Sequence, residues 1–197
     1  ETGCTHEGHD TEVAWTKLEN ADQLKAGGNF YLAGDLDLSG AMTNPGAIEI
    51  KEDLNLCLNG HKLTLGSNYL KSSGSTYNFG ATINICDCAG NGSIESTEST
   101  KATIYMEYAN LNLWFGTIIG SKNSSRGGGV YMYYGTFNMY GGTITGGEAT
   151  YGGGGVYLGY GTFNMYGGSI EENTGGSKGG GGVYIGGGST CTFNFYD

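Results

Sequence analysis

The second half of the chain repeats itself about every 26 residues, and this repeat restricts the possible folds more than any other feature. The unit is rich in glycine and occurs as GGGVYMYYGTFNMYGGTITG at residues 127–146, GGGVYLGYGTFNMYGGSIEEN at 153–173 and GGGVYIGGGSTCTFNFYD at 180–197. Val130 therefore returns as Val156 and Val183, at offsets of 26 and 27 residues. Repeats of this length are typical of solenoids, in which each unit packs only against its neighbours.

Weaker copies of the unit extend the repeat toward the N-terminus. They lie at residues 102–120, 81–96, 47–66 and 29–40. No linker interrupts the series, so we predict a single solenoid domain of about six coils over residues 29–197, preceded by an N-terminal segment over residues 1–28. The sequence stops inside a strand pattern, so we expect the chain to be a fragment of a longer protein.

Each unit contains three short runs of alternating apolar and polar residues, such as Val-Tyr-Met, Thr-Phe-Asn-Met-Tyr and Thr-Ile-Thr. Alternation indicates strands, and the glycines between the runs indicate turns rather than helices. Three strands per unit predict an all-β fold, a right-handed parallel β-helix. A leucine-rich repeat is disfavoured because its Leu/Asn consensus and helical return arm are missing. A calcium-binding nonapeptide repeat is disfavoured because its aspartate is missing.

Successive side chains of a strand point to opposite faces, so the alternation also assigns each position to the core or to the surface. The inward rows are apolar throughout: Ile104/Val130/Val156/Val183, Met106/Met132/Leu158/Ile185, Leu111/Phe137/Phe163/Phe193, Leu113/Met139/Met165/Phe195 and Ile118/Ile144/Ile170. The outward rows are Tyr105/Tyr131/Tyr157/Tyr184, Trp114/Tyr140/Tyr166/Tyr196 and Asn112/Asn138/Asn164/Asn194.

A short N-terminal helix over residues 21–26 is predicted to cover the first coil. Asn20 can act as its N-cap, Gln23 occupies the capping-box position, and Gly27 ends the helix. The side chains expected to face the first coil are those of Trp15, Leu18 and Leu24.

The composition limits the functional classes. The chain has 9 basic and 19 acidic residues and a net charge of −10, which argues against nucleic acid and against polyanionic substrates. No apolar run approaches the roughly 20 residues of a membrane helix, so no membrane insertion is expected. Five cysteines in an acidic, glycine-rich chain favour an extracellular location. We expect no cofactor.

The consensus GGGVY…GTFNMYGGTITG resembles the β-helical repeat modules of large surface proteins of Gram-positive, especially gut-dwelling, bacteria, within the wider pectin-lyase-like superfamily. LNLCLNGHKLTL at 54–65 and INICDCAGNGSI at 83–94 resemble the opening coils of such a module. CTHEGHD at 4–10 resembles segments between modules. The resemblance implies a secreted, cell-surface β-helix with an adhesive or stalk role, while binding or catalysis has to be argued from the site itself.

Few residues could support catalysis. Asp35 and Asp37 lie on one outward strand face, about 7 Å apart by strand geometry, which matches the carboxyl spacing of an inverting glycosidase. We interpret them instead as a solvated strand face, and Glu171, Glu172 and His61 as turn residues. The strands of the best-preserved repeats hold no acidic residue or histidine, so a hydrolase built on them would lack a general acid. We therefore predict no catalytic residues.

The N-terminal segment has a spacing that could suit zinc, with Cys4, His6 and His9 as three ligands. The segment is terminal, and its cysteine can be oxidised instead of binding a metal. We therefore predict no metal site.

The cysteines suggest a disulfide. Aligning LNLC with INIC stacks Cys57 on Cys86 in neighbouring coils. The expected Cα separation, about 4.8 Å, suits a disulfide, so we predict Cys57–Cys86 on the outer surface. Cys88 is then available to bind Cys4, and Cys191 is left as the odd thiol.

Tyrosine is concentrated in the regular coils, because twelve of the fifteen tyrosines lie at or beyond Tyr105. The rings could simply stack on one another between coils about 4.8 Å apart. They could also bind a ligand, since tyrosine offers a large amphipathic contact area at a low entropy cost. The predicted ligand-binding face consists of Tyr105, Tyr131, Tyr133, Tyr134, Tyr157, Tyr160 and Tyr184, with Tyr108 at the next turn.

Three functions remain open. The first is a non-catalytic extracellular binding or adhesion module, a monomeric part of a multidomain bacterial surface protein that engages a host cell-surface protein or glycan. The second is a structural stalk or spacer. The third is a carbohydrate-active enzyme of the pectin-lyase-like kind.

Overall fold

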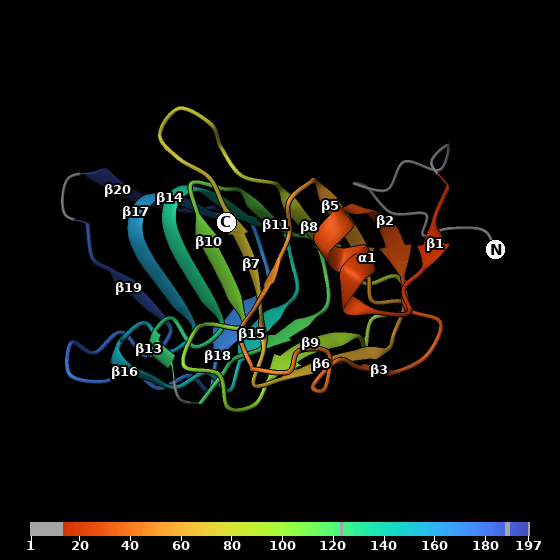
Figure 1. Cartoon of the computed structure of the whole chain (residues 1–197). Helices are drawn as coiled ribbons and strands as arrows, with labels where there is room; N and C mark the ends of the chain where they lie inside the picture. Colours follow the sequence, from red (N-terminus) through yellow and green to blue (C-terminus); the bar gives the residue numbers. More distant parts are fainter. Residues whose placement is uncertain (1–13, 123, 188–189, 197) are drawn as a thin grey trace.

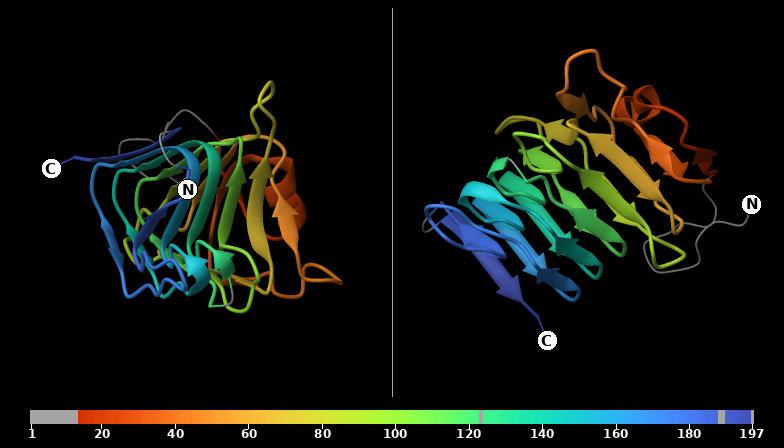
Figure 2. Two further views of the ribbon diagram at one scale, coloured as in Figure 1. Left: turned by 90° about the vertical axis from the view of Figure 1, so that its left-hand side faces the viewer. Right: turned by 90° about the horizontal axis from the view of Figure 1, so that it is seen from below.

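The chain winds into a right-handed parallel β-helix of about six coils (Figure 1). The computed structural model describes residues 14–122, 124–187 and 190–196. Figure 2 shows the coils stacked side by side along one axis, with the short helix at the N-terminal end. The all-β fold and the number of coils predicted from the repeat are confirmed.

Each coil contributes a strand to each of three faces. The first face, here the Asn face, contains β2 (Gly28–Tyr31), β5 (Leu54–Cys57), β8 (Ile83–Cys86), β11 (Leu111–Leu113), the second halves of β14 (Val130–Met139) and β17 (Val156–Met165), and β20 (Cys191–Phe195). The second face contains β3 (Leu36–Asp37), β6 (Lys62–Gly66), β9 (Ser93–Ser96), β12 (Thr117–Ile119), β15 (Thr143–Thr145) and β18 (Ser169–Glu171).

The third face, here the Tyr face, is continuous with the Asn face through β14 and β17, which bend from one to the other. Its strands are β4 (Ala47–Glu49), β7 (Tyr69–Ser73), β10 (Ile104–Glu107), the first halves of β14 and β17, and β19 (Val183–Ile185). Between the second and third faces, two loop strands pair outside the main sheets: β13 (Ser124–Arg126) and β16 (Ala149–Gly152).

The core has the predicted register. Ile104 pairs with Val130, Val130 with Val156 and Val156 with Val183. The other inward rows stack in the same way. Most of these side chains are fully buried, whereas Phe195 in the last coil is 68% exposed.

An uninterrupted ladder of asparagine amides runs along the Asn face. In each step the amide nitrogen of one coil donates to the amide oxygen of the preceding coil, at 2.6–2.9 Å. The ladder consists of Asn29, Asn55, Asn84, Asn112, Asn138, Asn164 and Asn194. The outward row predicted from the regular repeats therefore extends through the degenerate coils as well.

The N-terminal cover begins with β1 (Thr16–Lys17), which pairs with β2, and continues with α1 (Ala21–Ala26). The predicted capping box between Asn20 and Gln23 is present, and the helix ends at Gly27. Leu18 and Leu24 belong to the main core as predicted. Trp15 does not, because its ring packs on the outer surface of the first coils beside Cys57.

Adjacent coils approach so closely in the late turns that a side chain has no room. A Cβ on Gly120 would lie 2.5 Å from the Cα of Gly147 and 2.8 Å from the carbonyl carbon of Gly128. In the first coil, by contrast, a Cβ on Gly34 would meet nothing within 4 Å. Glycine is therefore a packing requirement in the late coils.

Candidate functional site

The seven predicted tyrosines share one side of the molecule, but they are unequally exposed. Tyr105, Tyr131, Tyr157 and Tyr184 form one stack with ring centroids 4.4, 5.4 and 5.4 Å apart. Tyr131 and Tyr157 are only 8% exposed, and burial raises the pKa of both phenols. The middle of this row does not offer the exposed rings expected of binding anchors, because the rings pack on one another and on neighbouring side chains.

Two residues that the sequence did not single out cover this row. Tyr151 of β16 packs at 6.3 Å from Tyr157 and 5.9 Å from Tyr184. The Arg126 guanidinium lies 4.9 Å from the ring centre of Tyr151 and 5.7 Å from that of Tyr157. Both come from the loop strands between the second and third faces.

The more accessible rings lie where the Tyr face turns into the Asn face. Phe79 packs edge-on to Tyr108 at 6.4 Å, Tyr108 stacks on Tyr134 at 4.7 Å, and Tyr134 stacks on Tyr160 at 4.7 Å. We call these four side chains the aromatic ridge. Tyr134 and Tyr160 belong to the predicted face, whereas Phe79 was missed because its segment does not follow the repeat.

The backbone of the ridge is strained. Tyr108 and Tyr134 have φ angles of 50° and 58°, in the left-handed region that glycine occupies without penalty. A bulky side chain costs about 1–2 kcal/mol there. Strained backbone persists where surrounding structure enforces it and is enriched at functional sites. Large aromatic side chains thus occupy turn positions where glycine would cause less backbone strain.

A loop over residues 74–80, between β7 and β8, projects from the body of the β-helix beside the ridge (Figure 1, yellow). Backbone hydrogen bonds in both directions between Ser75 and Asn78, at 2.7 and 3.2 Å, hold it in shape. Tyr77 is 100% exposed and Phe79 is 51% exposed. The loop sequence GSTYNFG has the composition of antibody binding loops, which are rich in Tyr, Ser, Gly and Asn.

A shallow cavity of about 210 Å³ separates the loop from the ridge. Its lining residues are Thr76, Phe79, Tyr108, Tyr134 and Gly135. The cavity is small and mostly aromatic, so it could accept a single side chain of a partner. The loop, the cavity and the ridge together form the candidate site.

A second exposed aromatic row follows the Asn face. The rings of Trp114, Tyr140, Tyr166 and Tyr196 stack at 4.0, 5.0 and 4.5 Å. Tyr140 and Tyr166 are 37% and 43% exposed. This row has the predicted register.

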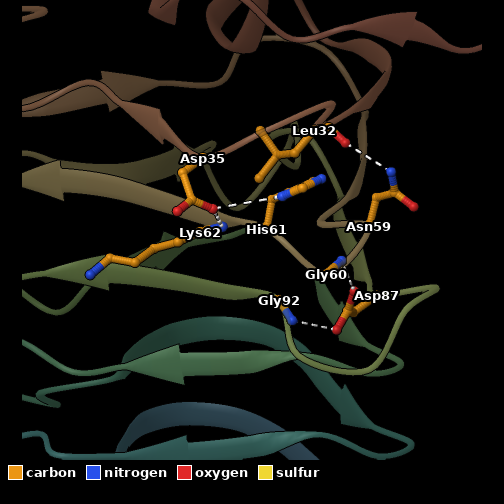
Figure 3. A network of polar contacts seen from close by, with 8 residues as sticks. All are labelled: Leu32, Asp35, Asn59, Gly60, His61, Lys62, Asp87 and Gly92. Carbon is orange, nitrogen blue, oxygen red and sulfur yellow. Dashed lines mark hydrogen bonds and ion pairs between the residues drawn. The ribbon is translucent and has the colours of Figure 1, made fainter.

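The carboxylates considered for catalysis stabilise turns instead (Figure 3). Asp35 Oδ1 accepts a hydrogen bond from the Lys62 backbone N–H at 2.9 Å and lies 3.7 Å from His61 Nδ1. Asp37 accepts from the Ser39 N–H at 2.8 Å, and the hydrogen bonds of Ser39 hold the pKa of Asp37 below its usual value. A general acid needs a raised pKa, so the geometry favours the turn interpretation for Asp35, Asp37 and His61.

The same figure shows how buried turns of the early coils are closed. Asp87 is 3% exposed and accepts from the backbone N–H groups of Gly60 and Gly92, both at 2.6 Å. Asn59 donates to the Leu32 carbonyl oxygen at 3.0 Å. The contacts of Asp87 with Gly60 and of Asn59 with Leu32 link one coil to its neighbour, whereas the contact with Gly92 closes the turn within one coil.

The cysteine prediction is right in register and wrong in bonding. Cys57 and Cys86 are partners in the pairing of β5 and β8, but the structure has them as thiols rather than as a disulfide. The Cys57 sulfur also lies 2.7 Å from that of Cys88, which is itself disulfide-bonded. The side chains of Cys57 and Cys86 face away from the main core and are nevertheless buried, packed against Trp15 and Trp114.

Other predicted features lie partly outside the described residues. The proposed Cys4–Cys88 link and the Cys4, His6 and His9 cluster involve such residues. Within residues 14–122, 124–187 and 190–196, no group of three or more His, Cys, Asp or Glu side chains could hold a metal ion. In the same ranges, no helix is long and apolar enough to cross a membrane. Cys191 is a thiol, as predicted.

Comparison with known proteins adds no functional assignment. No protein-family model, no curated protein and no solved structure matches this chain.

Proposed function

We propose that this chain is a non-catalytic, extracellular binding or adhesion module of a bacterial surface protein. Its ligand is a host cell-surface protein, held by the 74–80 loop and the aromatic ridge. The observation that carries this proposal is the fully exposed Tyr77 on an ordered loop, next to a cavity lined by Phe79, Tyr108 and Tyr134.

Rigidity supports a binding role. The ridge residues are fixed by stacking between coils, so little side-chain freedom is lost when a partner docks. Aromatic residues around a small pocket, surrounded by Ser, Thr, Asn and Gly, have the composition of binding hot spots. The strained φ angles of Tyr108 and Tyr134 are explained if function, rather than stability, keeps aromatic residues there.

The stacking geometry favours a protein over a glycan. A sugar ring binds on the open face of an aromatic ring, whereas stacked rings present mainly their edges and hydroxyl groups. Tyr134 is stacked on both sides, by Tyr108 and by Tyr160. Ring edges and hydroxyl groups suit the carbonyl oxygens and side chains of a protein surface.

The proposal is tested by screening the chain against host cell-surface proteins and, in parallel, against glycan arrays. For any protein ligand found, Tyr77→Ser and Phe79→Ala should each weaken binding by about 2 kcal/mol. The controls are Tyr140→Ala and Tyr166→Ala, which remove exposed rings from the second row, 37% and 43% exposed, and should leave binding unchanged. Equal losses from both sets, or binding that survives every substitution, would contradict the assignment.

Tyr108→Gly separates function from stability. It relieves an unfavourable φ angle, so the melting temperature should fall less than a loss of stacked ring area predicts, while binding is lost. A ligand found only on glycan arrays would move the assignment to a glycan.

A structural spacer is the second candidate, because the asparagine ladder gives the module regular, rigid coils along its whole length. The spacer hypothesis predicts that neither the screen of host cell-surface proteins nor the glycan arrays yield a ligand.

A further inference from the structure

We propose that the loops beside the Tyr face form a separate binding site for an acidic peptide segment. The site consists of Lys101, Arg126, Tyr151 and Lys178, which we call the cationic column. It does not depend on the aromatic ridge.

The four residues occupy corresponding positions on successive coils. The Ser125 N–H donates to the Thr100 carbonyl at 3.3 Å, which aligns the residues that follow them, Lys101 and Arg126. Pairing of β13 with β16 then places Arg126 beside Gly152, next to Tyr151. The Lys178 N–H donates to the Tyr151 carbonyl at 2.7 Å. Three positive charges therefore follow the solenoid axis at intervals of one and two coil spacings, about 4.8 and 9.6 Å.

Aromatic rings hold these cations. The Lys101 ammonium lies 5.1 Å from the ring centre of Tyr105. The Arg126 guanidinium and the Lys178 ammonium lie 4.9 and 6.0 Å from that of Tyr151. Such contacts orient a cation without neutralising it, so the charges remain available to an incoming anion.

The cations of the column are not neutralised by carboxylates. Among the described residues, none of the three lies within 4.0 Å of a carboxylate oxygen. Among the other described lysines, Lys17, Lys25, Lys62 and Lys71 are paired with carboxylates, whereas Lys51 and Lys122 are not. The low total number of basic residues argued against polyanions, but it concealed this local concentration.

The surroundings favour an acidic peptide. Arg126 can bind a carboxylate with two parallel hydrogen bonds. The adjacent tyrosine row is stacked and buried at its middle, so it offers no flat open ring face for a sugar. An extended chain with Asp and Glu side chains, lying along the column, could reach each cation in turn.

Fluorescence anisotropy with labelled poly-L-glutamate at low ionic strength tests the site. We expect saturable, salt-sensitive binding, despite the repulsion expected from the net charge. Arg126→Gln should weaken it about tenfold, and Lys101→Gln or Lys178→Gln about threefold each. The control is Lys51→Gln, which removes the same charge from an exposed lysine at the opposite end of the solenoid and should change affinity less than about twofold.

Two further variants separate charge from geometry. Arg126→Lys keeps the charge but loses bidentate hydrogen bonding. Its affinity for poly-L-glutamate should therefore lie between those of the wild type and Arg126→Gln. Tyr151→Ser removes the supporting ring and should weaken binding while the β-helix stays folded, with a melting temperature lowered by the lost packing on Tyr157 and Tyr184. Equal losses from Arg126→Gln and Lys51→Gln, or no binding of poly-L-glutamate, would overturn the proposal. Binding of dextran sulfate alone would assign the column to sulfated glycans instead.

Discussion

The early coils, from β2 to β9, and the late coils, from β10 to β18, hold neighbouring turns together by a different balance of polar contacts and close glycine packing. In the early coils, side chains such as Asp35, Asn59 and Asp87 reach across to the backbone of the adjacent coil. In the late coils, glycine lets the backbones approach directly, and aromatic rings stack outside them. The difference is one of balance, because Gly66 and Gly92 are also tightly packed in the early coils, and Asn173 reaches the backbone of the adjacent coil in the late ones.

The difference explains where binding surfaces can develop. Polar side chains that close a turn are already occupied, as Asp87 is by Gly60 and Gly92. Glycine turns leave the outward positions of the strands free for large residues. Both sites proposed above therefore lie mainly on the late coils, with only the 74–80 loop contributed by the early ones.

The largest effect is expected where the two halves do not differ, in the apolar core. Val156→Asp should destabilise the fold by at least about 4 kcal/mol, because it places an unpaired charge in a position that is 0% exposed. Thermal unfolding followed by circular dichroism measures this. The control is Thr143→Asp on the outward side of β15. An unchanged melting temperature for Val156→Asp would mean that the inward assignment is wrong.

Asp87→Ala tests how much the hydrogen bonds from side chains to the backbone stabilise the early coils. It leaves the backbone N–H groups of Gly60 and Gly92 without their acceptor inside the protein. We expect a loss of about 3 kcal/mol in the free energy of unfolding, measured by urea titration. Asp37→Ala, at an exposed carboxylate, should cost much less. Equal effects at the two positions would show that the Asp87 contacts do not fasten the turn.

Gly120→Ala tests the close packing of the late coils. The added Cβ would lie 2.5 Å from the Cα of Gly147, so the two coils must separate. A destabilisation of about 2 kcal/mol follows from overpacking of this kind. Gly34→Ala in the first coil, where nothing lies within 4 Å, should stay within about 0.5 kcal/mol of wild type. If both substitutions are tolerated, the contrast between early and late turns is lost.

Raising the pH into the alkaline range should gradually lower the free energy of unfolding, through the buried tyrosines of the late coils. Burial raises the pKa of Tyr105, Tyr131 and Tyr157 above the ordinary value of 10.0. These phenols stay protonated in the folded state at a pH where the unfolded chain ionises. Their contribution to the free energy of unfolding is fully present below pH 10. It is lost as the pH rises toward the pKa of the folded state, at up to about 1.4 kcal/mol per pH unit for each tyrosine. Absorbance at 295 nm and circular dichroism should change together, and Tyr131→Phe should unfold at higher pH.

The repeat was enough to predict the fold, because every inward row is apolar and only one register satisfies all of them. It also predicted the ridge tyrosines Tyr108, Tyr134 and Tyr160, but it predicted neither the 74–80 loop nor the cationic column. Tyr77 and Phe79 lie in an excursion from the repeat, whereas Arg126 and Lys178 lie in loops whose alignment depends on backbone bonds between coils. The burial of Tyr131 and Tyr157 was also missed, since alternation shows which side of a strand a residue faces but not what covers it.

The asparagine ladder makes the length of this molecule adjustable. Successive rungs of the late coils are separated by 26 residues, and every rung has the same donor and acceptor polarity. If one whole repeat unit is duplicated or deleted, the two coils that become neighbours therefore form the same asparagine–asparagine hydrogen bond. Each added copy would extend the protein by about 4.8 Å without a compensating change elsewhere. Unequal recombination between repeat copies in the gene would therefore change the length of such a protein by whole coils.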